Sequence, residues 1–205
     1  MDTTHFTIVI PTRRRLATFK HALQTCLSQQ YQRFEVIALV NSCTETAQYV
    51  SQVGDEKVRS IESQTDLPMT ENWERLFELT LEPSTYVLYL GDDDGLLPGA
   101  LECAHRIIRQ HHCAVLNWEK AEYAWPDIVA SAYRNYASVK LSTSLEQVRT
   151  APFLISAHAM ETSYSAGPSI YSSFIKLSIL REIRQSAQGR FFRSCSPDVL
   201  SLIHI

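Results

Sequence analysis

The sequence predicts an α/β protein in which helices flank a mostly parallel β-sheet. Short apolar runs rich in β-branched residues alternate with helical segments over about the first 118 residues. Such alternation is typical of βαβ units joined by right-handed crossovers. With 205 residues, 45% of them hydrophobic and 20% charged, the chain has enough apolar side chains to build one core.

The first half alternates regularly between the two kinds of element. Strands are expected at 6–10, 35–40, 57–61, 86–90 and 114–118, and helices at 16–29, 44–53, 70–81 and 98–112. The runs FTIVI (6–10) and EVIALV (35–40) are nearly continuous in apolar residues, as strands buried on both faces are. Leu16, Phe19 and Leu23 recur at helical spacing, which predicts an amphipathic helix.

The second half has a looser pattern. From about residue 119 aromatic and serine residues are scattered without a clear period, and only a strand at 169–175 and a helix at 179–187 are expected. The chain ends SPDVLSLIHI, one or two turns into a predicted helix, so we expect the native protein to continue past Ile205. We therefore expect two halves, 1–118 and 119–205, of which the second is incomplete at its C-terminus.

Composition narrows the class of protein. The net charge of −3 gives no support to a nucleic-acid-binding surface. Five cysteines are scattered with no C-x-x-C pair, which argues against a structural zinc site and a disulfide framework. We expect reduced thiols in a cytoplasmic protein. The N-terminus lacks the order of a signal peptide, and no apolar run approaches the roughly 20 residues of a membrane span.

Three polar clusters follow predicted strands: Thr12 to Arg15, Asn41 to Thr44, and Asp92 to Asp94. In an open α/β sheet, ligands bind at the carboxyl ends of the strands. Cations, hydroxyls and carboxylates along one edge suit a phosphorylated ligand held through a metal ion, and hard oxygen ligands favour Mg²⁺ or Mn²⁺.

The Asp run also has a simpler interpretation, as a solvated turn or a charge cap at a helix N-terminus. Local sequence leaves both open. A calcium EF-hand is excluded because the twelfth position counted from Asp92 is Cys103. Arg13 and Arg14 can likewise be ordinary surface residues.

A second group of metal-type side chains, His111 and His112 beside Cys113, lacks a second ligand pair. Histidine is favourable at the C-terminus of a helix because of the helix macrodipole. The sequence therefore favours a helix end over a metal site there.

Four motifs together resemble the family 2 glycosyltransferases with the GT-A fold. They are IVIPT (8–12), FEVIALVN (34–41), NWE (72–74) and LGDDD (90–94). Each motif is a weak signal, but their order and spacing make the resemblance specific. It covers about residues 5–118 and implies a Rossmann-like, three-layer α/β/α fold.

The resemblance implies transfer of a sugar from a nucleotide-diphosphate donor to an acceptor hydroxyl, with inversion and with Mn²⁺ or Mg²⁺. Residues 1–118 would form the nucleotide-sugar-binding half and 119–205 the acceptor-side half. The acceptor would be a glycan or a lipid-linked glycan, in cell-surface polysaccharide or related glycan synthesis. The protein would work in the cytoplasm, with a peripheral association at the cytoplasmic face of the membrane as one option.

The resemblance also implies roles for individual residues. The metal ligands would be Asp92, Asp93 and Asp94, and the residues contacting the nucleotide sugar would be Pro11, Thr12, Arg15, Asn41, Asn72, Asp92 and Asp93. The carboxylate base would be Asp198, in the motif SPDV (196–199). A helix N-terminus would keep Asp198 ionised, although a plain charge cap accounts for it equally well.

Two positions depart from the family pattern. Gly91 stands where relatives often carry the first carboxylate, and Val40 stands where relatives carry an Asp that contacts the nucleotide base. The identity of the nucleotide base therefore stays open, and Asn41 would take over part of the role of the missing Asp. Two alternatives follow: a degenerate donor-binding domain without turnover, or a nucleotidyltransferase. The latter is disfavoured because PTRRRL (11–16) contains no glycine.

Overall fold

The computed structural model describes residues 4–83, 85–139 and 169–192. The strands are β1 (His5–Thr12), β2 (Phe34–Asn41), β3 (Val58–Ser63), β4 (Thr85–Tyr89), β5 (Val115–Asn117), β6 (Glu122–Tyr123), β7 (Ala137–Ser138) and β8 (Ser173–Lys176). The helices are α1 (Leu16–Leu27), α2 (Thr44–Val53), α3 (Met69–Glu74), α4 (Ala100–His111) and α6 (Leu177–Ser186), with short 3₁₀ helices η1 (Arg75–Glu78) and η2 (Ser131–Tyr133).

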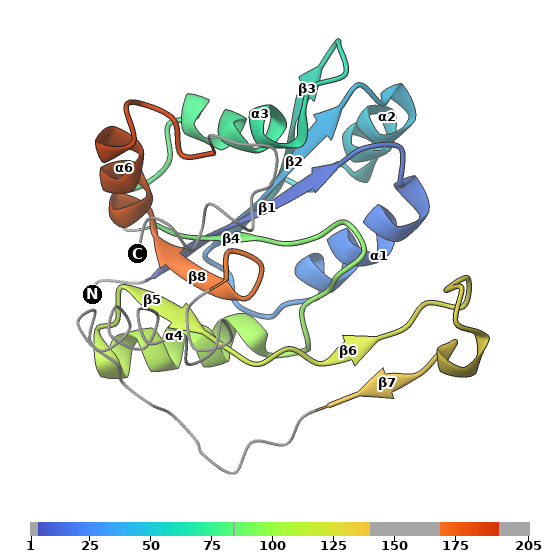
Figure 1. The fold of residues 1–205 in the computed structure, drawn as a ribbon. Coiled ribbons are helices and arrows are strands. Elements are labelled where there is room, and N and C mark those ends of the chain that lie inside the picture. Colours follow the sequence, from blue (N-terminus) through green and yellow to red (C-terminus); the bar gives the residue numbers. More distant parts are fainter. Residues whose placement is uncertain (1–3, 84, 140–168, 193–205) are drawn as a thin grey trace, which may run out of the picture.

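Six strands form the main sheet in the order β3-β2-β1-β4-β8-β5 (Figure 1). The central strand β1 is parallel to β2 and β4, and β2 is parallel to β3. The strand β8 is antiparallel to both β4 and β5. The predicted mostly parallel sheet is confirmed.

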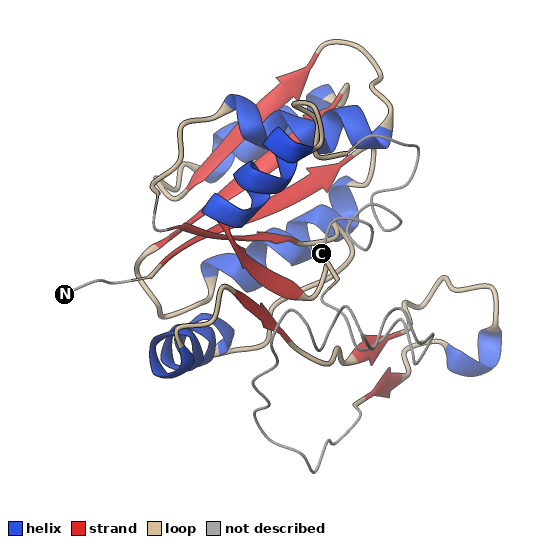
Figure 2. Cartoon of the chain, turned by 60° about the vertical axis from the view of Figure 1, so that its left-hand side comes forward, coloured by secondary structure: helices blue, strands red, loops and turns tan. Residues whose placement is uncertain are grey.

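Helices cover both faces of this sheet, which gives the predicted three layers (Figures 1 and 2). Alternate side chains of each strand point to opposite faces. On one face Ile8 and Leu88 share a core with α1, α2 and α4. On the other face Val9 and Tyr89 pack in a core with α3, η1 and α6. Because both faces are covered, the central strands are apolar nearly throughout.

Some elements differ from the expectation in extent. The helix expected at 70–81 is α-helical only to Glu74 and continues as the 3₁₀ helix η1, a common way for a helix to tighten at its end. The strand expected at 169–175 is the shorter β8, and α6 follows it directly. Since β8 lies between β4 and β5, a strand from the later half completes the sheet of the earlier half.

A two-stranded ribbon of β6 and β7, absent from the prediction, extends away from the main sheet (Figure 1). The amide of Ala124 donates to the carbonyl of Tyr136 at 2.8 Å, and the Tyr123 hydroxyl donates to Asn135 at 3.0 Å. Strands of two residues are too short to produce an alternating hydrophobic pattern, which is why the sequence did not indicate them.

The remaining expectations concern cysteines, histidines and membrane spans. Among the described residues, Cys26, Cys43, Cys103 and Cys113 are free thiols. His111 ends α4 and His112 follows it as the C-cap, with a left-handed φ of 49°. Across the described ranges, no helix is both long and apolar enough to cross a membrane.

Candidate functional site

The three predicted polar clusters lie at one edge of the sheet because β1, β2 and β4 run in parallel. Thr12 ends β1 and Asn41 ends β2. The amide of Leu90 donates to the carbonyl of Val9 at 2.8 Å, so the chain leaving β4 stays beside β1 as it enters the Asp run.

The Asp92 carboxylate is held by β1 and by the residue that precedes α1. The Thr12 hydroxyl donates to Asp92 Oδ2 at 2.9 Å, and Arg15 Nη1 donates to Asp92 Oδ1 at 2.9 Å. The side chain is 7% exposed. Burial raises the pKa of Asp92, while the hydroxyl and the guanidinium oppose that rise. Both carboxylate oxygens therefore already have a partner.

The next two carboxylates differ from Asp92 and from each other. Arg15 Nη2 donates to Asp93 Oδ2 at 2.5 Å, so one guanidinium bridges two carboxylates. Asp94 is exposed, and its backbone amide closes a turn to the carbonyl of Gly91 at 3.1 Å. Desolvation and the adjacent Asp93 charge raise the pKa of Asp94. A cation close to this pair would relieve that repulsion.

The Asp93 and Asp94 carboxylates both lie close against Gly91. A Cβ added at Gly91 would lie 2.6 Å from Asp94 Oδ2 and 3.2 Å from Asp93 Oδ1. Two carboxylate oxygens thus approach one point of the backbone, which a side chain at position 91 would prevent. They suit Mg²⁺ or Mn²⁺, which protein sites commonly hold through one or two carboxylates together with substrate phosphates. Among the described residues, no group of three or more His, Cys, Asp or Glu side chains is placed to hold a metal ion.

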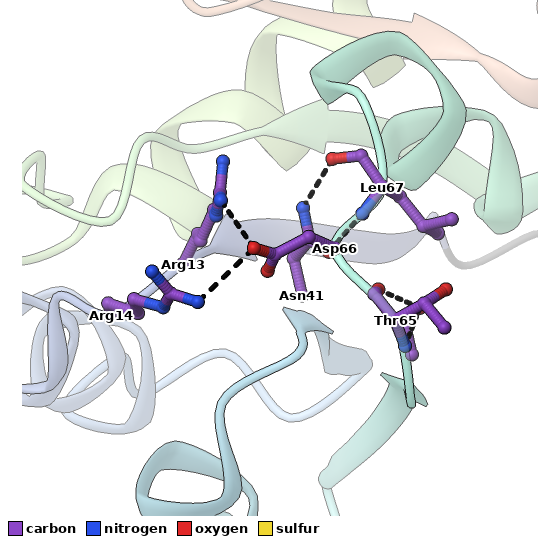
Figure 3. Close-up of polar contacts among 7 residues, drawn as sticks. Arg13, Arg14, Asn41, Thr65, Asp66 and Leu67 are labelled. Carbon is purple, nitrogen blue, oxygen red and sulfur yellow. Dashed lines mark hydrogen bonds and ion pairs between the residues drawn. The ribbon is translucent and has the colours of Figure 1, made fainter.

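Asn41 is buried and its amide is paired with the backbone of Leu67 (Figure 3). Asn41 Nδ2 donates to the Leu67 carbonyl at 2.8 Å, and the Leu67 amide donates to Asn41 Oδ1 at 2.9 Å. Asn41 therefore shapes the loop QTDLP (64–68) that follows β3. Its neighbour Val40 is 1% exposed and belongs to the core.

This loop carries Asp66, which the sequence did not single out. Asp66 Oδ2 accepts hydrogen bonds from Arg13 Nη2 at 2.7 Å and from Arg14 Nη2 at 3.2 Å (Figure 3). Arg14 has a φ of 56°, the left-handed region that non-glycine residues seldom adopt. The two arginines are exposed, but they lie at the sheet edge and hold an acidic group there.

The remaining residues predicted for the site are Asn72, Pro11 and Asp198. Asn72 is 3% exposed, and its Nδ2 donates to the carbonyl of Leu39 at 3.1 Å. Its Oδ1 is buried and has no hydrogen-bond partner within the described part of the chain. Pro11 is buried in β1, next to Thr12. Asp198 lies outside the described residues.

Trp125 joins the site from the β6–β7 ribbon. Its indole Nε1 donates to the backbone carbonyl of Asp93 at 3.2 Å, and its ring centroid lies 5.9 Å from that of His21. This contact was not predictable from the sequence, because Trp125 lies in the segment without a hydrophobic period.

A mostly parallel sheet in this order, flanked by helices and with polar side chains along its carboxyl edge, is the GT-A glycosyltransferase architecture. The family model described as "Glycosyl transferase family 2" matches residues 7–159. The chain belongs to glycosyltransferase family 2, which decides against the nucleotidyltransferase alternative. No curated protein matches the chain.

Solved structures resemble the chain in fold. TarS 1-349 from S. aureus aligns with 96% of this chain and 54% of its own, at 13% identity and a TM-score of 0.62. The same protein in complex with UDP has 14% identity over the same shares, with a TM-score of 0.59. A mannosyltransferase from Pyrobaculum calidifontis, in complex with GDP-Man and Mn²⁺, has 14% identity, covers 57% of this chain and 35% of its own, and has a TM-score of 0.47. The chain spans about half or less of each structure's length.

Proposed function

We propose that this chain is the donor-binding and transfer region of a metal-assisted, inverting glycosyltransferase. The observation that supports it most is the pair of carboxylate oxygens, from Asp93 and Asp94, that lie close together against Gly91, with Arg15 bonded to Asp93. Residues 1–118 would bind the nucleotide sugar and 119–205 would contribute to the acceptor side.

Asp94 and Asp93 would hold Mg²⁺ or Mn²⁺. A divalent ion bound there supplies Lewis-acid stabilisation of the leaving nucleoside diphosphate. Asp92 has a different part: with Thr12 it fixes Arg15, so that the guanidinium lies next to the same place. A fixed positive charge is effective there because it needs no reorganisation as negative charge develops on the leaving group.

Donor recognition would involve the two strand ends that carry Thr12 and Asn41. Asn41 acts indirectly, since its amide is occupied by the backbone of the loop that carries Asp66. With Val40 buried in the core, Asp66 is the carboxylate that this loop presents at the edge. Asn72, with its unpaired buried Oδ1, and Pro11 would complete the walls of the nucleotide pocket.

In the transfer step, the acceptor hydroxyl oxygen would attack the anomeric carbon as its bond to the diphosphate oxygen breaks. The hydroxyl proton would pass to a carboxylate base, for which we propose Asp198. The acceptor would be a glycan or a lipid-linked glycan of a cell-surface polysaccharide pathway. We place the reaction in the cytoplasm, because the five cysteines of the sequence have no spacing typical of a disulfide framework.

A panel of UDP, GDP and TDP sugars, titrated calorimetrically with and without Mn²⁺, tests the proposal. A uridine donor is the first choice, because the TarS fold neighbour was crystallised with UDP. We expect Mn²⁺-dependent binding of at least one donor, and a loss of turnover of about 100-fold or more in Asp94→Asn. The matched control Asp127→Asn makes the same charge change in the ribbon and should act as wild type. Absence of Mn²⁺-dependent binding to every donor would contradict the proposal.

The second candidate is a donor-binding domain without turnover, favoured by the apolar Val40 at the usual base-contacting position. It predicts nucleotide binding with neither transfer nor donor hydrolysis. Measuring release of free nucleotide diphosphate from the bound donor separates the two candidates. Release that depends on Asp94 supports the enzyme, and binding without release supports the degenerate domain.

A further inference from the structure

The loop from Gly91 to Gly99, which carries the carboxylate pair, rests against the C-terminal end of α1. Two side chains face this loop: Thr25, in the last turn of α1, and Gln29, just past the C-cap Ser28 that ends the helix. The Gln29 amide still reaches back to the carbonyl of Thr25, at 3.1 Å. Neither has a part in the site as described above.

Gln29 is 5% exposed, and its side-chain amide is fully paired. Gln29 Nε2 donates to the carbonyls of Thr25 at 3.1 Å and Leu97 at 3.0 Å, and Oε1 accepts the amide of Leu101 at 3.3 Å. The helix α4 has Gly99 at its N-cap and no side-chain cap from that residue. Gln29 supplies a cap from another element instead, so that loop and helix start are fixed to α1.

Thr25 contacts the same loop at Leu96, one residue nearer to the carboxylates than the contact of Gln29 with Leu97. Its hydroxyl donates to the Ala22 carbonyl at 2.7 Å and accepts the amide of Leu96 at 3.0 Å. The backbone at Gly95 approaches so closely that an added Cβ would lie 3.0 Å from Thr25 Cγ2. Glycine at position 95 is therefore what allows the loop to lie against the helix.

The carboxylate pair is thus held from both sides. On one side the Leu90 amide bonds to β1 at 2.8 Å, and on the other the Leu96 amide bonds to Thr25. The intervening turn from Gly91 to Asp94 has one backbone hydrogen bond of its own. Ligands must be held to within about 0.5 Å to bind a metal ion well, so these outer contacts add to the direct contacts of Arg15 and Trp125 with Asp93 in setting the positions of the carboxylates.

We propose that Thr25 and Gln29 are positioning residues, which set the geometry of Asp93 and Asp94 for the divalent ion through the loop that follows. This inference rests on the proposed function. It extends that proposal to groups that touch neither metal nor donor and that act through the backbone at Leu96, Leu97 and Leu101.

The test measures binding of Mn²⁺ alone by electron paramagnetic resonance titration, with thermal unfolding in parallel. Thr25→Val removes the hydroxyl and keeps the size of the side chain. We expect its Mn²⁺ affinity to fall about tenfold, the usual scale for groups that orient metal ligands, and Thr25→Ser to restore most of it. Thr7→Val is the control: it removes a buried hydroxyl, bonded to Glu35, that has no contact with the loop.

A second variant changes the loop side of the same contact, and it keeps the inference testable if Thr25→Val does not fold. Gly95→Ala should lower Mn²⁺ affinity because its methyl group meets Thr25 Cγ2. In a Thr25→Ser background that carbon is absent, so Gly95→Ala should cost measurably less. Additive losses would overturn the inference, since they would show that residues 25 and 95 do not act through contact.

The outcomes separate this inference from the proposed function. If the wild type binds Mn²⁺ and Thr25→Val and Gly95→Ala bind it equally well, only the positioning role is overturned. If the wild type takes up no Mn²⁺, the metal-assisted mechanism and the positioning role both fall. An affinity loss of the same size in Thr7→Val would show a general effect of fold stability and would also overturn the role.

Discussion

Two groups of arginine and aspartate lie at the same edge of the sheet. Their arginines, Arg13 and Arg15, are two residues apart in the loop that follows β1. Arg15 binds Asp92 at 2.9 Å, and Arg13 binds Asp66 at 2.7 Å. The distances are alike, but the Asp92 side chain is 7% exposed and the Asp66 side chain 41%. The two arginines are equally exposed, so we expect burial of the carboxylate, and not distance, to make the Asp92 pair the stronger one, because water screens a contact less on its buried side.

The two groups differ in how freely their side chains can rearrange. The buried group, in which Asp92 also accepts the Thr12 hydroxyl, keeps one arrangement because a broken contact would leave a buried polar atom unpaired. The exposed group can exchange partners at little cost. Under the proposed function, Arg13 and Arg14 would turn from Asp66 to a phosphate of the donor, whereas Arg15 would keep its contacts with Asp92 and Asp93.

The largest expected effect comes from breaking the buried group with Asp92→Ala. The variant leaves the Thr12 hydroxyl buried and unpaired and frees Arg15 to move, so we expect the free energy of unfolding to fall by roughly 2 kcal/mol. Donor affinity should fall as well, by about tenfold. Urea denaturation and calorimetric donor titration measure the two losses. Asp66→Ala is the matched control, and an equal loss of stability there would contradict the comparison.

An intermediate effect is expected at Asp94, whose pKa is raised in the folded protein. Ionised Asp94 lowers stability at neutral pH. That penalty disappears as the pH falls through the raised pKa towards the unfolded value of about 3.9, since the native state then binds the extra proton. Asp94→Asn should therefore melt about 1 °C above wild type at neutral pH, with a difference that vanishes near pH ~4. Melting curves across this range check the sign, and a difference that grows on acidification would contradict it.

The smallest effect is expected from Asp66→Asn. Both of its arginine partners are exposed, so the unfolding free energy should change by only about 0.2 kcal/mol, the low end for exposed ion pairs. Thermal unfolding at low salt should detect it, and it should disappear at about 1 M salt, where the Debye length is about 3 Å. A loss that persists at high salt would show that this pair is less exposed to solvent than the comparison requires.

The strands that carry the site were predictable because their signal is local. β1, β2 and β4 are apolar runs buried on both faces, and each is followed by polar residues, so the edge that collects Thr12, Asn41 and Asp92 follows from parallel pairing alone. The motifs then led to the correct family. The place of β8 in the sheet was not predictable, because the local pattern of its four residues does not encode an antiparallel position between β4 and β5.

The partners within the site depended on the tertiary structure. Charge and residue type do not distinguish Arg15 from its two neighbours, yet among these three arginines it is the side chain of Arg15 that bonds to Asp92, 77 residues away. Asn41 is matched to Leu67 across 26 residues, and Gln29 to Leu97 across 68. Such contacts require the register of the sheet and the packing of α1 to be set first. The amino-acid pattern thus supplies the edge and its chemistry, and packing decides which of its charges are buried, which are paired and which can bind.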